Sequence, residues 1–304
     1  MIIQKTGKID DDLYVIGSAA IPVYLLDGPV PVLFDAGLTA GAFVYEDGIK
    51  KILGERDPEF LFLTHSHFDH VGSVSHFKEV WPDLKIVGSV KCREILLKPK
   101  AVQLIRDLNF EGSKNIKKMG LSPINEKGFE SFELDILVQP DQTIEPAPGL
   151  SVVALNTPGH TWDFISYWIP ERKILIASEA VATYENKGYL QPEFLVDFDA
   201  YIDSLNRLKN LGATILCPGH YAAFTDEDVI VHIHSSIKAA NDYLSMTEKF
   251  LTQEKGNMEQ VVLRVKAEEW DNRPWPKQPE SAYLLNTWQR VNTIWNRMNR
   301  NSII

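Results

Sequence analysis

The sequence predicts an α/β fold that fills one large domain or two modest ones. Short runs rich in Val, Ile and Leu alternate with helical stretches before a helical C-terminal segment, which is typical of α/β architecture. Apolar residues make up 44% of the 304 residues and charged residues 24%, as in ordinary globular proteins. A chain of this length buries a sizeable core, so it needs no disulfides to fold.

The first third of the chain predicts a β-meander, a helix and a buried strand, in that order. Runs at 12–17, 22–26 and 31–34 are bounded by Gly, Pro or Asp, as strands commonly are. A helix is predicted around 43–53, and the apolar run 60–63 indicates a short buried strand. We then expect a helix from about 72 to 79, a strand at 85–87 and an irregular helical insertion between 91 and 120.

The rest of the chain predicts further strands and then helices only. Strands are expected at 151–155, 164–169, 173–177 and 213–216, and the three-to-four apolar spacing of 200–211 indicates an amphipathic helix. From Asp226 onward two or three helices are expected, with a break at 271–279 where Pro274, Pro276 and Pro279 lie. We therefore expect a main domain at 1–225 and a helical extension at 226–304 packed on it or involved in a homodimer.

Charge and cysteine content limit the partners and the compartment. A formal net charge of −10 repels phosphate backbones, which excludes nucleic acid as a general partner. Basic residues outnumber acidic ones between Lys91 and Lys118, either as a solvated helical face or as a rim that attracts an anionic substrate. Cys92 and Cys217 fit neither a disulfide framework nor a thiolate zinc site. With no export signal and no membrane span, we expect a cytoplasmic protein without a membrane partner.

One segment concentrates the chemistry of a metal site. Thr64-His65-Ser66-His67-Phe68-Asp69-His70 places three imidazoles and a carboxylate directly after the apolar strand. In extended backbone His65 and His67 can point the same way, and the next helix can turn Asp69 and His70 toward a neighbouring point. Without a cation these groups would repel one another or stay unsatisfied. The segment therefore predicts a site that can serve two metals.

Two more histidines lie in Gly-bearing turns after β-type runs. They end the sequences Thr157-Pro158-Gly159-His160 and Cys217-Pro218-Gly219-His220, where strands would deliver both to one sheet edge. Glu179 follows another apolar run and completes a set of seven ligands. The isolated His76, His232 and His234 are expected to be structural, as lone histidines usually are.

These motifs, with Asp35 in Val32-Leu33-Phe34-Asp35-Ala36-Gly37, resemble those of the metallo-β-lactamase superfamily in identity and in order. The resemblance covers about residues 10–225 and implies a four-layer αββα sandwich with a catalytic site at one edge. It implies that the first metal is held by His65, His67 and His160, the second by Asp69, His70 and His220, and that Glu179 bridges them. Asp35 is expected to orient a ligand histidine without binding metal itself.

One position departs from the family pattern. The bridging residue is normally an aspartate preceded by glycine, whereas here Glu179 follows Ser178. The extra methylene leaves three alternatives: Glu179 bridges both metals, binds one, or weakens the second site. Two divalent ions are expected, zinc before iron or a mixed pair.

The resemblance implies a metallo-hydrolase in which a metal-bridging hydroxide cleaves a thioester, a lactone or another ester of a small acyl substrate, anionic in one interpretation. Asp69 and Glu179 are the expected catalytic residues. The His-x-His-x-Asp-His form is shared by glyoxalase II-like thioesterases and acyl-homoserine lactonases, and the stretch 10–26 with the helical C-terminus is similar to the quinolone-signal-response thioesterase group. Two alternatives stay open: a mono-iron persulfide dioxygenase or di-iron redox protein of this fold, and a signal-response protein with weak thioesterase activity.

Overall fold

The computed structural model describes residues 1–114, 116, 121–185, 188–274, 277–278 and 280–301. Lys117 and Lys118 of the basic run, and Pro276 and Pro279 of the predicted break, lie outside the described residues. The chain divides into two compact units, of which the first comprises Met1–Asn156, Asp163–Ser178 and Gly212–Val229, and the second Thr157–Trp162, Glu179–Leu211 and Ile230–Ile304. The expected boundary at residue 225 stays a prediction.

The first unit is built on two seven-stranded sheets. One has the order β2 (Gly7–Asp10), β3 (Leu13–Ser18), β4 (Ile21–Leu26), β5 (Val32–Phe34), β6 (Phe60–Phe62), β7 (Lys85–Ser89), β8 (Ile136–Val138). The other has the order β1 (Ile2–Ile3), β16 (Ala223–Thr225), β15 (Ile215–Cys217), β12 (Ile174–Ile176), β11 (Ile165–Ile169), β10 (Leu150–Asn156), β9 (Thr143–Ala147). Strands β5 to β8 run parallel, which brings their carboxyl ends to one edge of the first sheet.

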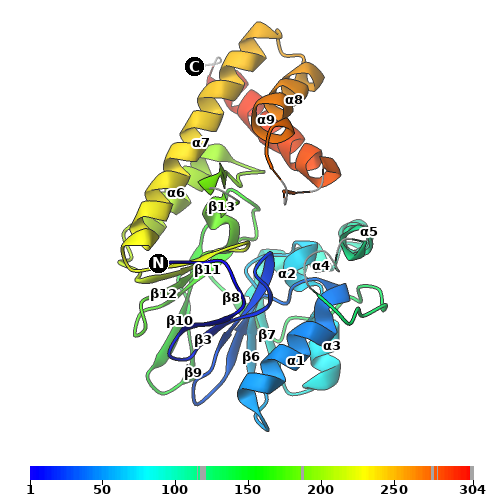
Figure 1. Ribbon diagram of the computed structural model, residues 1–304, viewed down its shortest axis with the longest axis vertical. Coiled ribbons are helices and arrows are strands. Elements are labelled where there is room, and N and C mark those ends of the chain that lie inside the picture. The colour runs from blue at the N-terminus through cyan, green and yellow to red at the C-terminus, as the bar shows by residue number, and fades with distance from the viewer. Residues whose placement is uncertain (115, 117–120, 186–187, 275–276, 279, 302–304) are drawn as a thin grey trace. The chain divides into compact units, whose positions relative to one another are not determined.

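The central strands β5 and β6 of the first sheet serve two cores, because successive side chains point to opposite faces. Phe34 and Phe62 face the second sheet, and the ring centroid of Phe62 lies 5.1 Å from that of Tyr167 on β11. Leu33 and Leu61 face the other way, into a core that the helices complete. These helices are α1 (Ala42–Leu53), α2 (Phe68–Val71), α3 (Val74–Val80), α4 (Val90–Leu96) and α5 (Pro99–Ser113), with a 3-10 turn at Thr39–Gly41. Figure 1 shows α1 and α3 beside this sheet.

The second unit contains a two-stranded ribbon and the C-terminal helices. Its elements are β13 (Thr183–Tyr184), β14 (Leu190–Gln191), α6 (Phe198–Lys209), α7 (Glu227–Gln253), α8 (Met258–Lys266), a π-helical turn (Ala267–Asp271) and α9 (Glu280–Asn301). Helix α7 begins at the end of the first unit and continues into the second. Tyr283 on α9 is fully buried, and its ring lies 5.9 Å from that of Trp270. Packing of these helices against the main domain or a second copy stays a prediction.

The meander predicted at 12–34 is confirmed by the antiparallel pairs β3–β4 and β4–β5. The predicted helices at 43–53 and 200–211 correspond to α1 and α6, and the helices expected after Asp226 are α7, α8 and α9. Within the described residues, no helix is both long enough and apolar enough to cross a membrane.

Candidate metal centre

The segment His65 to His70 begins where the buried strand β6 ends. The residues of β6 are buried, and the strand pairs with β5 on one side and β7 on the other. The chain therefore leaves the sheet at the carboxyl end of β6. His67 has extended backbone, with φ −67° and ψ 150°, and α2 begins at the next residue. The ring centroid of His65 lies 4.5 Å from that of His67 and 4.4 Å from that of His70. The strand end and the short helix thus bring the three predicted imidazoles together.

Asp35, at the end of β5, holds two parts of this segment at once. Its Oδ1 accepts the backbone N–H of Thr64 at 2.8 Å, and its Oδ2 accepts Nδ1–H of His70 at 2.8 Å. The Thr64 hydroxyl lies 2.9 Å from Oδ2 of Asp35 and 3.0 Å from Nδ1 of His65. A hydroxyl has one proton, so when Thr64 donates to Asp35 its oxygen accepts from His65. The predicted contact between Asp35 and a histidine of the segment is confirmed for His70. Through the Thr64 hydroxyl, Asp35 is also linked to a second histidine, His65.

Asp35 adopts a left-handed backbone conformation, with φ 57°. This conformation is uncommon for residues other than glycine, but aspartate tolerates it better than most. The side chain is buried, with 4% of the residue exposed, and accepts hydrogen bonds from Thr64 and His70. The strain is therefore associated with a buried carboxylate that fixes its neighbours.

Asp69, His70 and His220 form a second group of donor atoms within 4.8 Å of one another. Nε2 of His70 lies 3.9 Å from Oδ1 of Asp69, and Nε2 of His220 lies 3.7 Å from Oδ2. The His220 ring comes from the loop after β15, and its Nδ1–H donates to the carbonyl of Ala20 at 2.7 Å. Strands far apart in sequence thus bring these residues together, as the sequence predicted.

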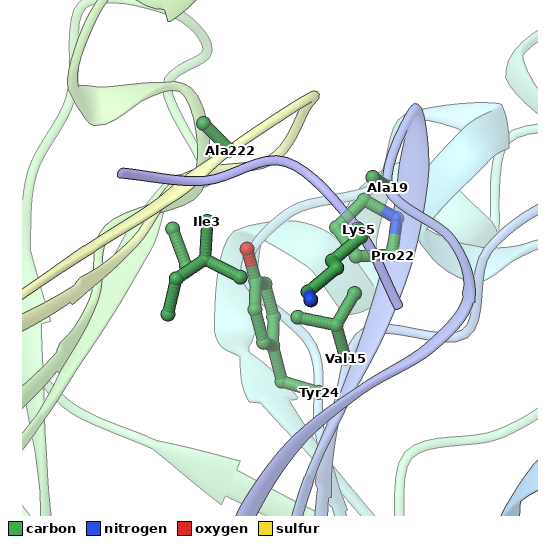
Figure 2. Close-up of a pocket in the computed structure, with 8 residues that line it drawn as sticks. Ile3, Lys5, Val15, Ala19, Pro22, Tyr24 and Ala222 are labelled. Atoms are coloured by element: carbon green, nitrogen blue, oxygen red, sulfur yellow. The ribbon is translucent and has the colours of Figure 1, made fainter. Parts of the chain in front are cut away.

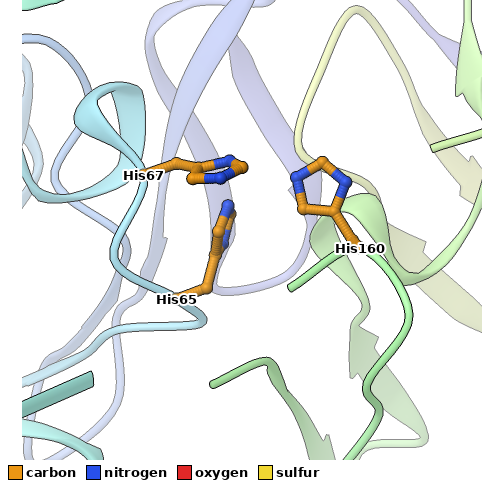
Figure 3. Close-up of side chains that lie close together, drawn as sticks. All are labelled: His65, His67 and His160. Atoms are coloured by element: carbon orange, nitrogen blue, oxygen red, sulfur yellow. The ribbon is translucent and has the colours of Figure 1, made fainter. Parts of the chain in front are cut away.

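His160 and Glu179 complete two other groups. Ring nitrogens of His65, His67 and His160 lie within 4.8 Å of one another, and Figure 3 shows these three side chains. His65, His70 and Glu179 form the third group under the same 4.8 Å limit. His160 and Glu179 are buried, with 3% of each residue exposed. All seven residues predicted as ligands therefore appear in at least one of the three groups, and His65 and His70 appear in two.

Ser178 stands where the family pattern has glycine. Ser178 has φ 45°, a left-handed conformation that glycine adopts at little cost. Its hydroxyl lies 3.5 Å from Oδ2 of Asp35. The turn before Glu179 therefore keeps the backbone conformation of a glycine turn with a serine in place.

Two residues that contact the segment belong to none of the sequence motifs described above. Asp163 accepts the backbone N–H of Ser66 at 2.9 Å. Asn109 of α5 donates to the carbonyl of Phe68 at 3.0 Å and accepts the N–H of Thr39 at 3.0 Å. The residue types are typical of side-chain capping of irregular backbone, but only the fold reveals their distant partners.

A small hollow lies beside the loop that carries His220. Ile3, Val15 and Tyr24 line it together with Lys5, Ala19, Pro22, Ala222 and Ala223, and Figure 2 shows most of these side chains. The Tyr24 hydroxyl donates to the carbonyl of Pro218 at 2.7 Å. The lining of the hollow is mostly apolar and contains none of the predicted ligands.

The two cysteines lie in the interior of the protein. Cys92 and Cys217 are free and buried, and burial raises the pKa of each thiol. A thiol with a raised pKa is a poor metal ligand, because the thiolate is the form that binds.

The donor set fits a divalent metal ion. Nδ1 of His70, His160 and His220 each faces an oxygen that carries no proton: the carboxylate of Asp35, the carbonyl of Glu193 and that of Ala20. Each Nδ1 therefore carries the hydrogen, which leaves the Nε2 lone pair available. Neutral imidazoles with carboxylates suit zinc and iron.

Comparison with known proteins agrees with this geometry. The family model described as the metallo-beta-lactamase superfamily matches residues 21–220. The chain belongs to this superfamily. A metallo-β-lactamase family protein of Thermus thermophilus has the same fold, with a TM-score of 0.64, 17% identity, and coverage of 96% of this chain and 95% of that one. The predicted fold is confirmed, as a mixed α/β fold with two sheets and C-terminal helices.

Several curated proteins resemble this chain at low sequence identity. A Beta-lactamase-like protein 2 homolog of Caenorhabditis elegans is 27% identical over 65% of this chain and 54% of its own length. A probable metallo-hydrolase of Bacillus subtilis is 26% identical over 65% of this chain and 77% of its own. An atrochrysone carboxyl ACP thioesterase of Aspergillus fumigatus is 24% identical over 53% of this chain and 38% of its own. The chain thus spans about half the worm relative and less of the fungal one.

Proposed function

We propose that this protein is a metal-dependent hydrolase that cleaves a thioester, or a related ester or lactone, of a small acyl substrate. The observation that carries the proposal is the convergence of four separate chain segments on three groups of imidazole and carboxylate donors. The thioesterase among the relatives favours the thioester within this class.

The ligand set of the proposal follows the three groups. His65, His67 and His160 would hold one ion, and Asp69, His70 and His220 the other, with Glu179 shared or bound to one ion only. Zinc is the proposed metal, and iron or a mixed pair is the alternative. When bound, such ions polarise a carbonyl and lower the pKa of water to about 7, so that a nucleophile is available at neutral pH.

The chain's own residues hold and move protons around this set. Asp35 keeps the proton of His70 on Nδ1, and so keeps Nε2 free for a metal. The Asp69 carboxylate lies between Nε2 of His70 and Nε2 of His220, with 14% of its side chain exposed. Asp69 can therefore contact both solvent and the ligand group, which suits a residue that passes a proton to a leaving group.

The remaining properties in the proposal concern partners and location. The substrate is a small acyl compound, and exposed basic residues such as Arg93 and Lys98 on the segment from Lys91 favour an anionic one. A homodimer and a cytoplasmic location belong to the same proposal.

The test combines metal content with a substrate panel. Purified protein is analysed for zinc and iron, and the zinc-loaded and iron-loaded forms are assayed on acyl thioesters, simple esters and lactones. We expect hydrolysis, with thioesters the best substrates. Asp69→Asn should lower kcat by about 100-fold or more, in the range for loss of general acid–base catalysis. The exposed Asp83→Asn is the matched control and should act like the unchanged protein.

Glu179→Asp decides whether the longer side chain limits the chemistry. We expect this variant to hold at least as much metal as the unchanged protein, because aspartate restores the family's usual ligand. If neither form hydrolyses any compound of the panel, the hydrolase proposal is wrong. Oxygen uptake with glutathione persulfide by the iron-loaded form would instead establish the dioxygenase alternative.

A further inference from the structure

Helix α9 contacts the irregular segment 192–197, which contains the carbonyl that accepts the hydrogen bond from His160. Nδ1–H of His160 donates to the backbone carbonyl of Glu193. Residues 192–197 belong to no helix or strand, so strand pairing does not fix the position of this carbonyl. Other contacts must fix this carbonyl, because the orientation of a buried imidazole depends on the position of the oxygen that accepts its hydrogen bond.

Two side chains of α9 bind the carbonyls on either side of Glu193. Nη1 of Arg290 donates to the carbonyl of Pro192 at 3.2 Å, and the Thr293 hydroxyl donates to that of Leu195 at 2.9 Å. Arg290 is fully buried and Thr293 is 5% exposed, so neither bond competes with bulk water. The segment is therefore held at two points from one helix, with the carbonyl of Glu193 between them.

Arg290 is itself held firmly. Nη2 donates to the Thr287 hydroxyl at 3.1 Å, the guanidinium lies 4.6 Å from the ring centroid of Tyr243, and Nη2 is 3.9 Å from Oε2 of Glu269. A buried cation in this setting needs several partners to offset its desolvation. The pairing with Glu269 and the aromatic ring keeps the guanidinium charged and in one orientation.

The other restraints on the segment act on different atoms. The carbonyl of Gly159 accepts the N–H groups of Leu195, Val196 and Asp197 at 3.0, 3.0 and 3.3 Å. These bonds fix the chain at Leu195 to Asp197, whereas the bonds from Arg290 and Thr293 act on the carbonyls that flank the peptide after Glu193. The N–H of Glu193 donates to the Tyr201 hydroxyl at 3.4 Å, which is a long bond.

We infer that Arg290 and Thr293 are positioning residues that set the orientation of the His160 imidazole through the 192–195 backbone. The inference rests on the proposed function, because His160 is a proposed metal ligand. It gives the C-terminal helix a role in the metal site that extends beyond packing.

The test replaces the Thr293 hydroxyl by a methyl group of the same shape. In the metal-free protein, the Nδ1–H proton of His160 is followed by NMR and identified by its absence in His160→Gln. We expect Thr293→Val to speed its exchange with solvent and to weaken Co²⁺ binding by about 10-fold, as for the loss of outer-shell support at metal sites. The visible spectrum of bound Co²⁺ should change with it, and Thr293→Ser should restore both.

Thr252→Val is the matched control. Thr252 is exposed on α7, and its hydroxyl donates to the carbonyl of Glu248 at 2.9 Å, within its own helix. The control therefore removes the same kind of hydrogen bond without touching the 192–195 backbone, and it should leave proton exchange and Co²⁺ binding unchanged. Arg290→Lys provides a second variant, which keeps the charge but loses the fixed fork of donors.

The outcomes separate the two proposals. If the unchanged protein binds no Co²⁺, the proposed function fails, while the His160 proton still tests the role of α9. If Thr293→Val and Arg290→Lys fold and show the exchange rate and Co²⁺ affinity of the unchanged protein, the positioning role is wrong.

Discussion

Replacing Asp35 by asparagine should damage metal binding without changing any proposed ligand. The backbone N–H of Thr64 donates to Oδ1, so the amide oxygen of an asparagine is drawn to that side. The amide NH₂ then takes the place of Oδ2 and faces Nδ1–H of His70. Two donors cannot share a hydrogen bond, so one of the two groups must change.

The structure allows two responses of His70 to this substitution, and the effect of each on stability and on metal binding can be estimated. If His70 keeps its proton on Nδ1, the charge-assisted bond is lost, which costs about 2 kcal/mol of stability in the metal-free protein. If the proton moves to Nε2, Nδ1 accepts from the amide and the fold keeps its stability. The proton then occupies the nitrogen that lies 3.9 Å from Asp69, where a metal would bind. Either response should weaken metal binding by about 10- to 100-fold.

Calorimetric titration of the metal-free protein with Zn²⁺ measures this effect, and urea unfolding distinguishes the two responses. Asp12→Asn is the control, because Asp12 pairs with Arg172 at a half-buried position and stands in none of the three donor groups. An Asp35→Asn protein that binds Zn²⁺ as tightly as the unchanged protein would refute the reasoning, since the bond from His70 would then not determine its tautomer.

Three further predictions concern stability. Burial lowers the pKa of His232 from 6.5 to about 4, so between these pH values the unfolded chain binds more protons than the folded protein. As the pH falls from 6.5 to 4, the free energy of unfolding of the metal-free protein, measured in urea, should therefore decrease by about 3 kcal/mol more than that of His232→Gln. Asn109→Leu leaves the N–H of Thr39 and the carbonyl of Phe68 unpaired, and should cost about 3 kcal/mol by the same assay, with the exposed Gln103→Leu on the same helix as a near-neutral control. Gly159 has φ 132°, and Gly159→Ala would place Cβ 2.5 Å from Cα of Tyr201, so the melting temperature should fall by several degrees at least; an unchanged value would contradict the tight approach.

The strands that the sequence predicts are those with a continuous buried or alternating pattern. The run at 60–63 was identifiable because β6 is buried on both faces, which requires apolar residues at every position. Strand β9 gave no such signal: its segment Thr143–Ala147 contains Pro146 and alternates between exposed and half-buried positions at an edge of its sheet. Strand β1 has two residues, too few for any period to appear.

The site shows a similar division. The histidines were predictable because their residue type and spacing both indicate metal chemistry, and Asp35 because a known family motif contains it. Thr64, Asp163 and Glu193 were not, since each acts through a bond whose partner only the fold places nearby. The bond from Ser66 to Asp163 spans 97 residues, and the bond from His160 uses the carbonyl of Glu193, a group that every residue possesses.

His70, His160 and His220 each donate Nδ1–H to a carboxylate or carbonyl oxygen, and they differ in what fixes that oxygen, which has consequences for how the site can be tuned. His70 donates to the side-chain carboxylate of Asp35, whose negative charge makes the ring more basic. Its acceptor is therefore not a backbone carbonyl. His160 and His220 donate to backbone carbonyls, so their orientation depends on whatever fixes those peptides. For His160, the side chains that bind the neighbouring carbonyls come from α9, at the opposite end of the chain from Asp35. Substitutions at Asp35 should therefore act directly on His70, and on His65 through Thr64, whereas substitutions at Thr293 should act on His160.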